Sequence, residues 1–465
     1  MDATLFFSLF FILCIIYISI SFFVSKSVKS VEDYFLAGRN LGFFQISISL
    51  IATQLGGGFI LGISDQAYKF GYYGLFYVFG ICLGFMLLGF GIASKLRAFN
   101  VDTIAQLFEV YYDSKFLRKM ASLTSILSLT GIFAAQIIGS KCLLVSLNLY
   151  NPILFIGLWF LIIVYAMLGG FKAIVQSDII QLSLIILVFL SLFVLDLIFN
   201  FSQTLSVFKF GWTNPIFLRD IKLQEIVGIA IIPALYSLIE QDLAQVFFAS
   251  KNGKLAKVSA LFASVFLLFF ALVPLYFGIK SRMLGFDIGI TSNALITLFD
   301  RQYDSLVVVL VTYGVLAAII STANGVLCAI SSNIVKDFDL PKLSSSNQLI
   351  LSKVVMFLVG IIGIILAFNF SDIIQVLIDS YSVPISSILI SLLALYFYAD
   401  PTQKNKIRFS KTAAYLSFFG GLITFLTLLF LKKNMLFSAE IDALLVSLTC
   451  YILGFLVDCF NRTKS

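Results

Sequence analysis

The chain has 465 residues, of which 60% are hydrophobic and 12% are charged, and its formal net charge is +7. A water-soluble protein with a mean hydropathy of +1.05 would expose large apolar surfaces, so the composition excludes a soluble globular protein. The sequence contains no histidine, which excludes zinc-protease motifs, Ser-His-Asp triads and histidine proton relays. The composition therefore predicts a polytopic membrane protein and not an enzyme.

Long apolar runs follow one another along the chain and predict an all-α fold. Runs of about 20 residues match the hydrocarbon core of a bilayer, and they lack the regular alternation of outer-membrane barrel strands. We predict about 13 transmembrane helices from these runs. Their ranges are 5–24, 42–67, 72–94, 116–145, 152–170, 174–199, 225–249, 258–279, 304–335, 348–369, 373–398, 412–431 and 437–459.

The loops between these spans predict the orientation. With the N-terminus outside, about 21 of the Lys and Arg residues fall on the inner side, as the positive-inside rule requires. This bias accounts for the net charge of +7 without a nucleic-acid partner. We expect a multi-pass protein of the cell's inner (cytoplasmic) membrane, with a cytoplasmic C-terminus, in contact with the lipid bilayer. The sequence indicates no cofactor and no obligate protein partner.

The stretch ISLIATQLGGGFILGISDQAYKFG, residues 48–71, has three consecutive glycines, Gly56, Gly57 and Gly58, within an apolar span. Each glycine costs about 1 kcal/mol of helix propensity relative to alanine. One interpretation is close packing against another helix. The other is a discontinuous helix that lines a cavity, where the freed carbonyls can coordinate a cation.

A second polar feature lies in the middle of the long span at 304–335. Helical spacing brings the Ala318 carbonyl and the hydroxyls of Ser321 and Thr322 onto one face. Hard cations such as Na⁺ bind several oxygens of this kind. The alternative is that both hydroxyls bond to carbonyls of their own helix.

Three stretches resemble the sodium:solute symporter family, which includes sodium/proline, sodium/pantothenate and sodium/glucose transporters. They are SVEDYFLAGRNLG at 30–42, GGFKAIVQSDIIQLSLI at 169–185 and AAIISTANGVLCAISSNIVKDF at 317–338. The resemblance covers about residues 30–400 and implies a leucine-transporter-type fold with two inverted five-helix repeats. The single transporter domain, 1–465, would then comprise an extra first helix at 5–24, repeats at 42–199 and 225–398, and two extra helices at 412–459. Each repeat would open with a broken helix, the second one near Pro233.

The resemblance also implies functional positions. A sodium site would use the carbonyls of Ala52, Leu55 and Ala318 and the hydroxyls of Ser321 and Thr322. The solute would bind near Gln54, Gly56, Gly57, Tyr236 and Gln241. Proline-type members have an aspartate where this chain has Gln54. Carboxylate-dependent ion binding and proline-like solute recognition are therefore not expected at Gln54.

Acidic residues in or near the spans have several possible roles. Asp178, at the expected inner mouth, would either form a structural ion pair or assist cation release. Glu240 and Asp242 are expected near the cytoplasmic end, exposed to water. Asp379 would face either the solute path or a packed interior.

The expected function is Na⁺-coupled uptake of a small organic solute, such as an amino acid or a carboxylate, by alternating access. Na⁺ would be the coupling ion, and no other cofactor is needed. A proton-coupled symporter, an uncoupled facilitator or channel, and a membrane-embedded sensor are the alternatives.

Overall fold

The computed structural model describes residues 3–26, 28, 30–214, 217, 223–289, 292–338, 345–370, 372–403, 409–431 and 437–464. These residues form helices and short connections. The longer helices are α1 (Ala3–Ser25), α3 (Phe43–Gln54), α5 (Leu75–Leu87), α8 (Lys115–Ser146), α9 (Pro152–Phe199), α10 (Phe201–Thr213), α11 (Leu223–Ser237), α13 (Gly253–Phe270), α14 (Leu272–Met283), α16 (Ser305–Asp337), α17 (Ser345–Ala367), α18 (Ile373–Ser387), α20 (Lys411–Leu431) and α21 (Ala439–Lys464). The shorter ones are α2 (Val31–Leu36), α4 (Ile63–Phe70), α6 (Ala93–Phe99), α7 (Gln106–Tyr112), α12 (Gln241–Phe248), α15 (Ala294–Gln302) and α19 (Leu389–Tyr398).

Among the described residues, eight helices are long and apolar enough to span a membrane, and the pair α18 and α19, bent by 61°, would make a ninth. The count is below the predicted number of about 13 for two reasons: some predicted spans run into one another, and others, such as 42–67, 225–249 and 373–398, are broken into shorter helices. For example, α9 covers the predicted spans 152–170 and 174–199, with a kink at Gly170, where φ is 61°. Likewise, the helical stretch Gly58–Phe99 joins the second half of a broken span to the next span.

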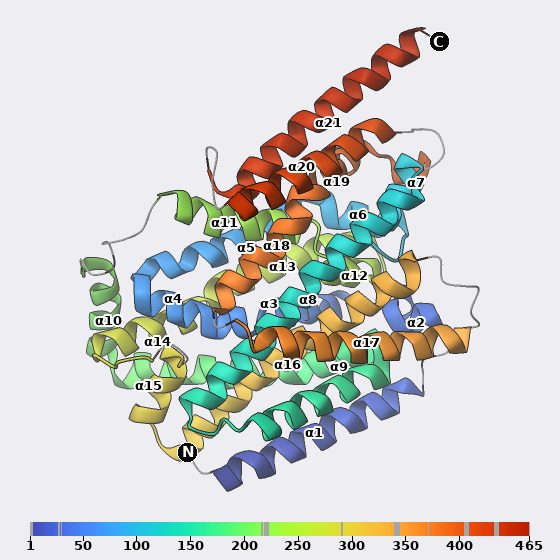
Figure 1. The fold of residues 1–465 in the computed structure, drawn as a ribbon. Helices are drawn as coiled ribbons and strands as arrows, with labels where there is room; N and C mark the ends of the chain where they lie inside the picture. Colours follow the sequence, from blue (N-terminus) through green and yellow to red (C-terminus); the bar gives the residue numbers. More distant parts are fainter. Residues whose placement is uncertain are drawn as a thin grey trace.

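The helices pack side by side in one bundle around α16 (Figure 1). Nearly the whole length of α16 is buried, because α8 and α9 pack on it and α3 lies against it. At one edge of the bundle α1 packs on α9, and at the opposite edge α20 and α21 pair with each other and contact α18 (Figure 1). The polar middle of α16 is therefore at the core of the molecule and away from lipid.

Two helices are broken inside the bundle. α3 ends at Gln54, Leu55 and Gly56 are not helical, and the chain resumes as a π-helical turn at Gly58–Gly62 that leads into α4. The second break separates α11 from α12 and ends at Glu240, whose backbone is extended. This break lies after Ser237 and not at Pro233, which remains within α11. The Ser237 hydroxyl, at the end of α11, donates to the Pro233 carbonyl one turn earlier at 2.9 Å.

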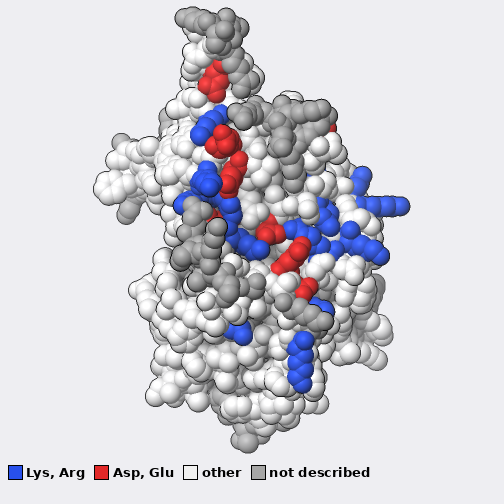
Figure 2. All heavy atoms as spheres, turned by 90° about the vertical axis from the view of Figure 1, so that its right-hand side faces the viewer, with Lys and Arg blue, Asp and Glu red and all other residues white. Residues whose placement is uncertain are grey.

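Lys, Arg, Asp and Glu side chains gather on one side of the bundle, at the right of Figure 1, which faces the viewer in Figure 2. We call this side, where α2, α6 and α7 meet the ends of α12 and α16, the charged face. The opposite face is formed by α4, α10, α14 and α15 (Figure 1). There, Lys280 and Asp196 form a buried ion pair at 2.5 Å, and Tyr276 donates to the same carboxylate at 3.1 Å.

Candidate ion and solute site

The hydroxyl pair of α16 lies directly against the break in α3. Thr322 Oγ1 donates to the carbonyl of Thr53 at 2.9 Å and lies 3.4 Å from the carbonyl of Ala52. Ser321 Oγ donates to Asp178 Oδ1 at 2.6 Å. These hydroxyls bond to other helices, so the alternative of bonds to their own helix is wrong for both.

Asp178 lies in the interior of the bundle, next to the hydroxyl pair. It is only 1% exposed, and its second oxygen accepts a hydrogen bond from Ser49 of α3 at 2.9 Å. The expected ion pair at an inner mouth is therefore replaced by hydroxyl contacts to α3 and α16. The result is a buried group of carboxylate, hydroxyl and carbonyl oxygens contributed by α3, α9 and α16, which is the ligand chemistry of a hard cation.

The other expected ion ligands lie close by. Ala318 is fully buried on α16, one turn before the hydroxyl pair. Leu55 is also buried and is the cap residue after the end of α3, with its N–H donating to the carbonyl of Ile51 at 2.9 Å. In the structure the carbonyl of Thr53, which was not among the expected ligands, receives the Thr322 hydroxyl.

Both interpretations of the glycine run are visible in the structure. The helix is broken at Gly56, and the same residue is closely packed: an added Cβ would lie 2.7 Å from Thr322 Oγ1 and 2.7 Å from Gln136 Oε1. The freed N–H of Gly57 donates to Gln136 Oε1 at 2.8 Å. Gln136 of α8 was not expected at the site, although a lone amide in an apolar span is a signal for such a role.

A small cavity of about 20 Å³ lies beside this oxygen group. This volume is room for about one water molecule. Gln54, Gly56, Tyr77, Glu240 and Tyr381 are among the residues that line it. Gln54 Nε2 donates to Glu240 Oε2 at 3.2 Å, so the two helix breaks meet at the cavity wall.

Aromatic rings close one side of the cavity. Tyr236 of α11 stacks on Tyr381 of α18, with ring centroids 4.2 Å apart and planes inclined by 14°. The hydroxyls of Tyr77 and Tyr381 lie 3.1 Å apart, and the Tyr236 hydroxyl accepts from Ser128 at 2.9 Å. Tyr236 was expected near the solute. Tyr77 and Tyr381 were not expected at the site, and the apolar neighbours of Tyr77 make it resemble an ordinary core residue.

Two expectations about acidic residues are wrong, and one residue expected near the solute lies outside the cavity lining. Glu240 and Asp242 are 5% and 3% exposed and not solvated, because the second break holds them inside the bundle. Gln241 is not among the residues that line the cavity, and its Oε1 accepts from the backbone N–H of Ile104 at 2.8 Å. Asp379 is exposed and accepts from Gln375 at 2.8 Å, so it does not face a packed interior.

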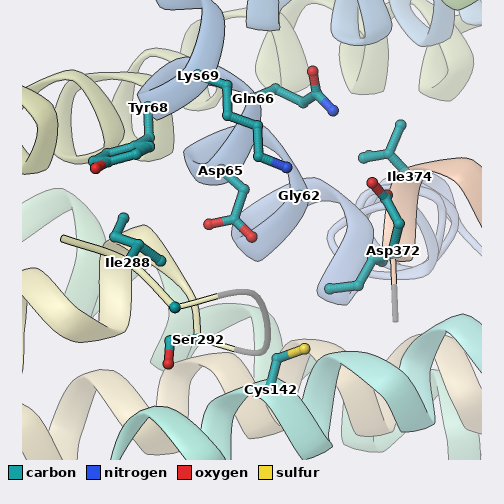
Figure 3. Close-up of a pocket in the computed structure, with 12 residues that line it drawn as sticks. Gly62, Asp65, Gln66, Tyr68, Lys69, Cys142, Ile288, Ser292, Asp372 and Ile374 are labelled. Carbon is teal, nitrogen blue, oxygen red and sulfur yellow. The ribbon is translucent and has the colours of Figure 1, made fainter. Parts of the chain in front are cut away.

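A larger pocket of about 330 Å³ lies towards the opposite face, between α4, α8, α18 and the segment around Ile288. Figure 3 shows Asp65 and Lys69 of α4 and Asp372, just before α18, around this space. Leu377 packs on Gly58 between this pocket and the small cavity, and Ile374 would lie 2.6 Å from a Cβ added to Gly62. A thin layer of aliphatic side chains thus separates the cavity from the pocket.

Ion pairs close the charged face. Asp102 pairs with Arg39 at 2.5 Å and with Lys336 at 2.7 Å, and Arg118 pairs with Asp337 at 3.0 Å. These contacts connect the segment before α3 and the start of α8 to the end of α16. The conformation is therefore closed at the charged face and hollow at the opposite face.

Solved structures show the same fold. A structure described as the substrate-bound outward-open state of a Na⁺-coupled sialic acid symporter, with a novel Na⁺ site, matches 97% of this chain and 96% of its own length, with a TM-score of 0.76 and 17% identity. Mhp1, a nucleobase-cation-symport-1 family transporter in a closed conformation with bromovinylhydantoin bound, covers 90% of this chain and 93% of its own, with a TM-score of 0.62 and 13% identity. The sequence profile of the sodium:solute symporter family matches residues 34–404. The chain belongs to the sodium:solute symporter family.

Proposed function

We propose that the protein takes up a small organic solute together with Na⁺ by alternating access. Membership of the family makes the chain a Na⁺-coupled transporter and not an enzyme. The observation that carries the proposal is the contact of Thr322 with the carbonyls of Ala52 and Thr53. Broken membrane helices of this kind supply backbone carbonyls for a coupling ion and helix ends for a solute.

Na⁺ would bind between the end of α3 and the middle of α16. The ligands we propose are the carbonyls of Ala52, Leu55 and Ala318 and the hydroxyls of Ser321 and Thr322. Asp178 would supply negative charge next to them, since Ser321 already bonds to its carboxylate at 2.6 Å. A carboxylate buried within a membrane is costly unless a cation or proton compensates it.

Coupling would follow from the position of this site between two helices that must separate when the protein opens at the charged face. Bound Na⁺ holds α3 and α16 together and keeps the ion pairs at the charged face intact. The solute then enters from the opposite face, past Leu377 and Ile374, and completes the cavity near Gln54, Gly56, Gly57 and Tyr236. A ligand shifts such an equilibrium only through its different affinity for the two states.

The topology proposed for the chain has about 13 spans, arranged as two inverted repeats at 42–199 and 225–398 with extra helices at 5–24 and 412–459. The meeting of the two breaks, at Gln54 and Glu240, supports this arrangement. We place the charged face in the cytoplasm, in agreement with the positive-inside rule. The similarity to a sialic acid symporter, at 17% identity, concerns the fold and does not identify the solute.

Reconstitution into liposomes tests the proposal. Small metabolites are screened for accumulation at a fixed pH under an imposed Na⁺ gradient, with K⁺ as the replacement ion. Accumulation above equilibrium that requires Na⁺ supports symport. Equilibration without accumulation would identify a facilitator, and accumulation driven by a pH gradient without Na⁺ would identify proton coupling.

A further inference from the structure

The solute cavity has an acidic wall with no basic residue opposite it. Glu240 lines the cavity and is 5% exposed, and its hydrogen-bond donor is the neutral amide of Gln54 at 3.2 Å. No Lys or Arg lines this cavity in the described part of the chain, and the sequence has no histidine. The cavity is therefore suited to a group that brings positive charge.

The nearby charge increases the need for a cation. Asp242 is 3% exposed, and it acts on Glu240 both electrostatically and through a side-chain hydrogen bond. Arg39, Arg118, Lys280 and Lys336 form their ion pairs with other carboxylates, and no Lys or Arg of the described ranges is among the main groups that act on Glu240 or Asp242. Two adjacent buried carboxyl groups share a proton, so the pair retains one negative charge, which is unfavourable in a membrane interior without a cation.

The aromatic rings add a second feature that favours a cation. Tyr77 and Tyr381 line the same cavity as Glu240, and Tyr236 stacks on Tyr381 at 4.2 Å. The face of an aromatic ring attracts a cation within about 6 Å of its centroid, and quaternary ammonium ligands are commonly bound by such rings. A carboxylate beside several tyrosines is thus a suitable environment for an alkylated or protonated amine.

The helix end that would bind an anionic solute is already occupied. Backbone N–H groups at the start of a helix are ready-made sites for carboxylates. At the start of the second half-helix, however, the N–H of Gly57 donates to Gln136 Oε1 at 2.8 Å. A Cβ added at Gly56 would lie 2.7 Å from the same oxygen, so the amide of Gln136 fills this position closely.

From these observations we infer that the transported solute is an organic cation whose ammonium group binds Glu240 among Tyr77, Tyr236 and Tyr381. This inference rests on the proposed function and narrows its solute from amino acids and carboxylates to amines. The closed cavity of about 20 Å³ must expand to admit such a solute. Separation of the stacked Tyr236 and Tyr381 would provide both the space and the ring faces.

Thermal stabilisation of the purified full-length protein tests the inference in Na⁺ and, separately, in K⁺. The probes are choline and ethylamine as cations, alanine as a zwitterion, lactate as an anion and glycerol as a neutral molecule. We expect a cation to stabilise the protein most in Na⁺. Glu240→Gln should raise the concentration of that cation needed for half-maximal stabilisation at least tenfold, whereas Glu240→Asp, which keeps the charge, should raise it less.

Glu440→Gln is the matched control, because Glu440 lies in the first turn of α21 and is not among the residues that line the cavity. It should leave the response to every probe unchanged. Stabilisation of Glu240→Gln by Na⁺ alone shows that this variant is folded. If Glu240→Gln does not fold, the comparison of Glu240→Asp with the unmodified protein carries the test.

The inference is overturned if lactate or glycerol stabilises the protein as well as the cations do. The inference is also overturned if Glu240→Gln binds the cation as tightly as the unmodified protein does. A Glu240→Gln variant that binds Na⁺ more weakly but keeps the same order of preference among the probes would overturn it as well. A protein that binds amines without any effect of Na⁺ would instead contradict the proposed coupling and leave the cation preference standing. The two failures are therefore distinguishable.

Discussion

Replacement of both Ser321 and Thr322 by alanine should weaken Na⁺ binding about tenfold. The variant removes both hydroxyls that face the break in α3 and leaves the backbone carbonyls in place. Thr322 donates to Thr53 at 2.9 Å, and Ser321 donates to Asp178 at 2.6 Å. The hydroxyls therefore make favourable contacts both in the ion-free state and in the Na⁺-bound state. The change in Na⁺ affinity depends on the difference between these two sets of contacts.

The magnitude follows from the difference between these states. A hydrogen bond or ligand contact to a charged group contributes about 1.5–3 kcal/mol, and one between neutral groups about 1 kcal/mol. Ser321 interacts with a charge in both states, with Asp178 or with the ion, so its two contributions nearly cancel. Thr322 exchanges a neutral carbonyl for the ion, which leaves a net loss of roughly 0.5–2 kcal/mol. A loss of about 1.4 kcal/mol corresponds to tenfold weaker binding.

The same reasoning ranks the single variants. Thr322→Ala should account for most of the loss, and Ser321→Ala for little of it. The assay is the Na⁺ dependence of thermal stability and of uptake in liposomes, with K⁺ as the replacement ion because an organic cation could compete for the solute site. The matched control is the double variant of Ser331 and Ser332 to alanine, which removes two buried hydroxyls from the same helix away from the break.

The control should alter stability but not the midpoint of the Na⁺ response. A folded Ser321 and Thr322 double variant with an unchanged midpoint would refute the assignment of the ion site. A larger effect of Ser321→Ala than of Thr322→Ala would refute the estimate and would indicate that the ion binds mainly at Asp178.

Three further outcomes are expected. Gly56→Ala places a Cβ 2.7 Å from Thr322 Oγ1, so it should cost about 1–3 kcal/mol of stability and abolish Na⁺-dependent uptake; unchanged uptake would show that the close approach is not needed. Arg39→Ala removes an ion pair worth about 1 kcal/mol from the charged face. Labelling of Cys328, which is fully buried behind α12, should then be about fivefold faster when followed by mass spectrometry, and an unchanged rate would argue against opening at this face. Lys280→Met leaves the Asp196 carboxylate buried without its cation, so it should destabilise the protein by about 3–5 kcal/mol. Thermal unfolding should show a smaller loss of stability when Lys280 and Asp196 are both replaced by apolar residues.

The sequence alone determined the class of the protein and the place of the first helix break, whereas the second break lies after Ser237 and not at the predicted Pro233. Composition predicts burial in lipid, and the glycines after Gln54 predict a broken helix, because helix propensity and hydropathy are properties of short segments. The hydroxyl pair in the middle of α16 was recognisable for the same reason. The family resemblance, based on contiguous motifs, was confirmed by the match of the family profile to residues 34–404.

Only the tertiary structure decided which polar groups meet. Asp178 is 129 residues from Ser49 and 143 from Ser321, yet it bonds to both. After the second break, Glu240 lines the cavity, whereas its neighbour Gln241 bonds to the backbone of Ile104. Spacing along a chain predicts the face of a single helix, but the partner of a buried side chain depends on how separate helices pack, and that packing is an interaction of the whole bundle.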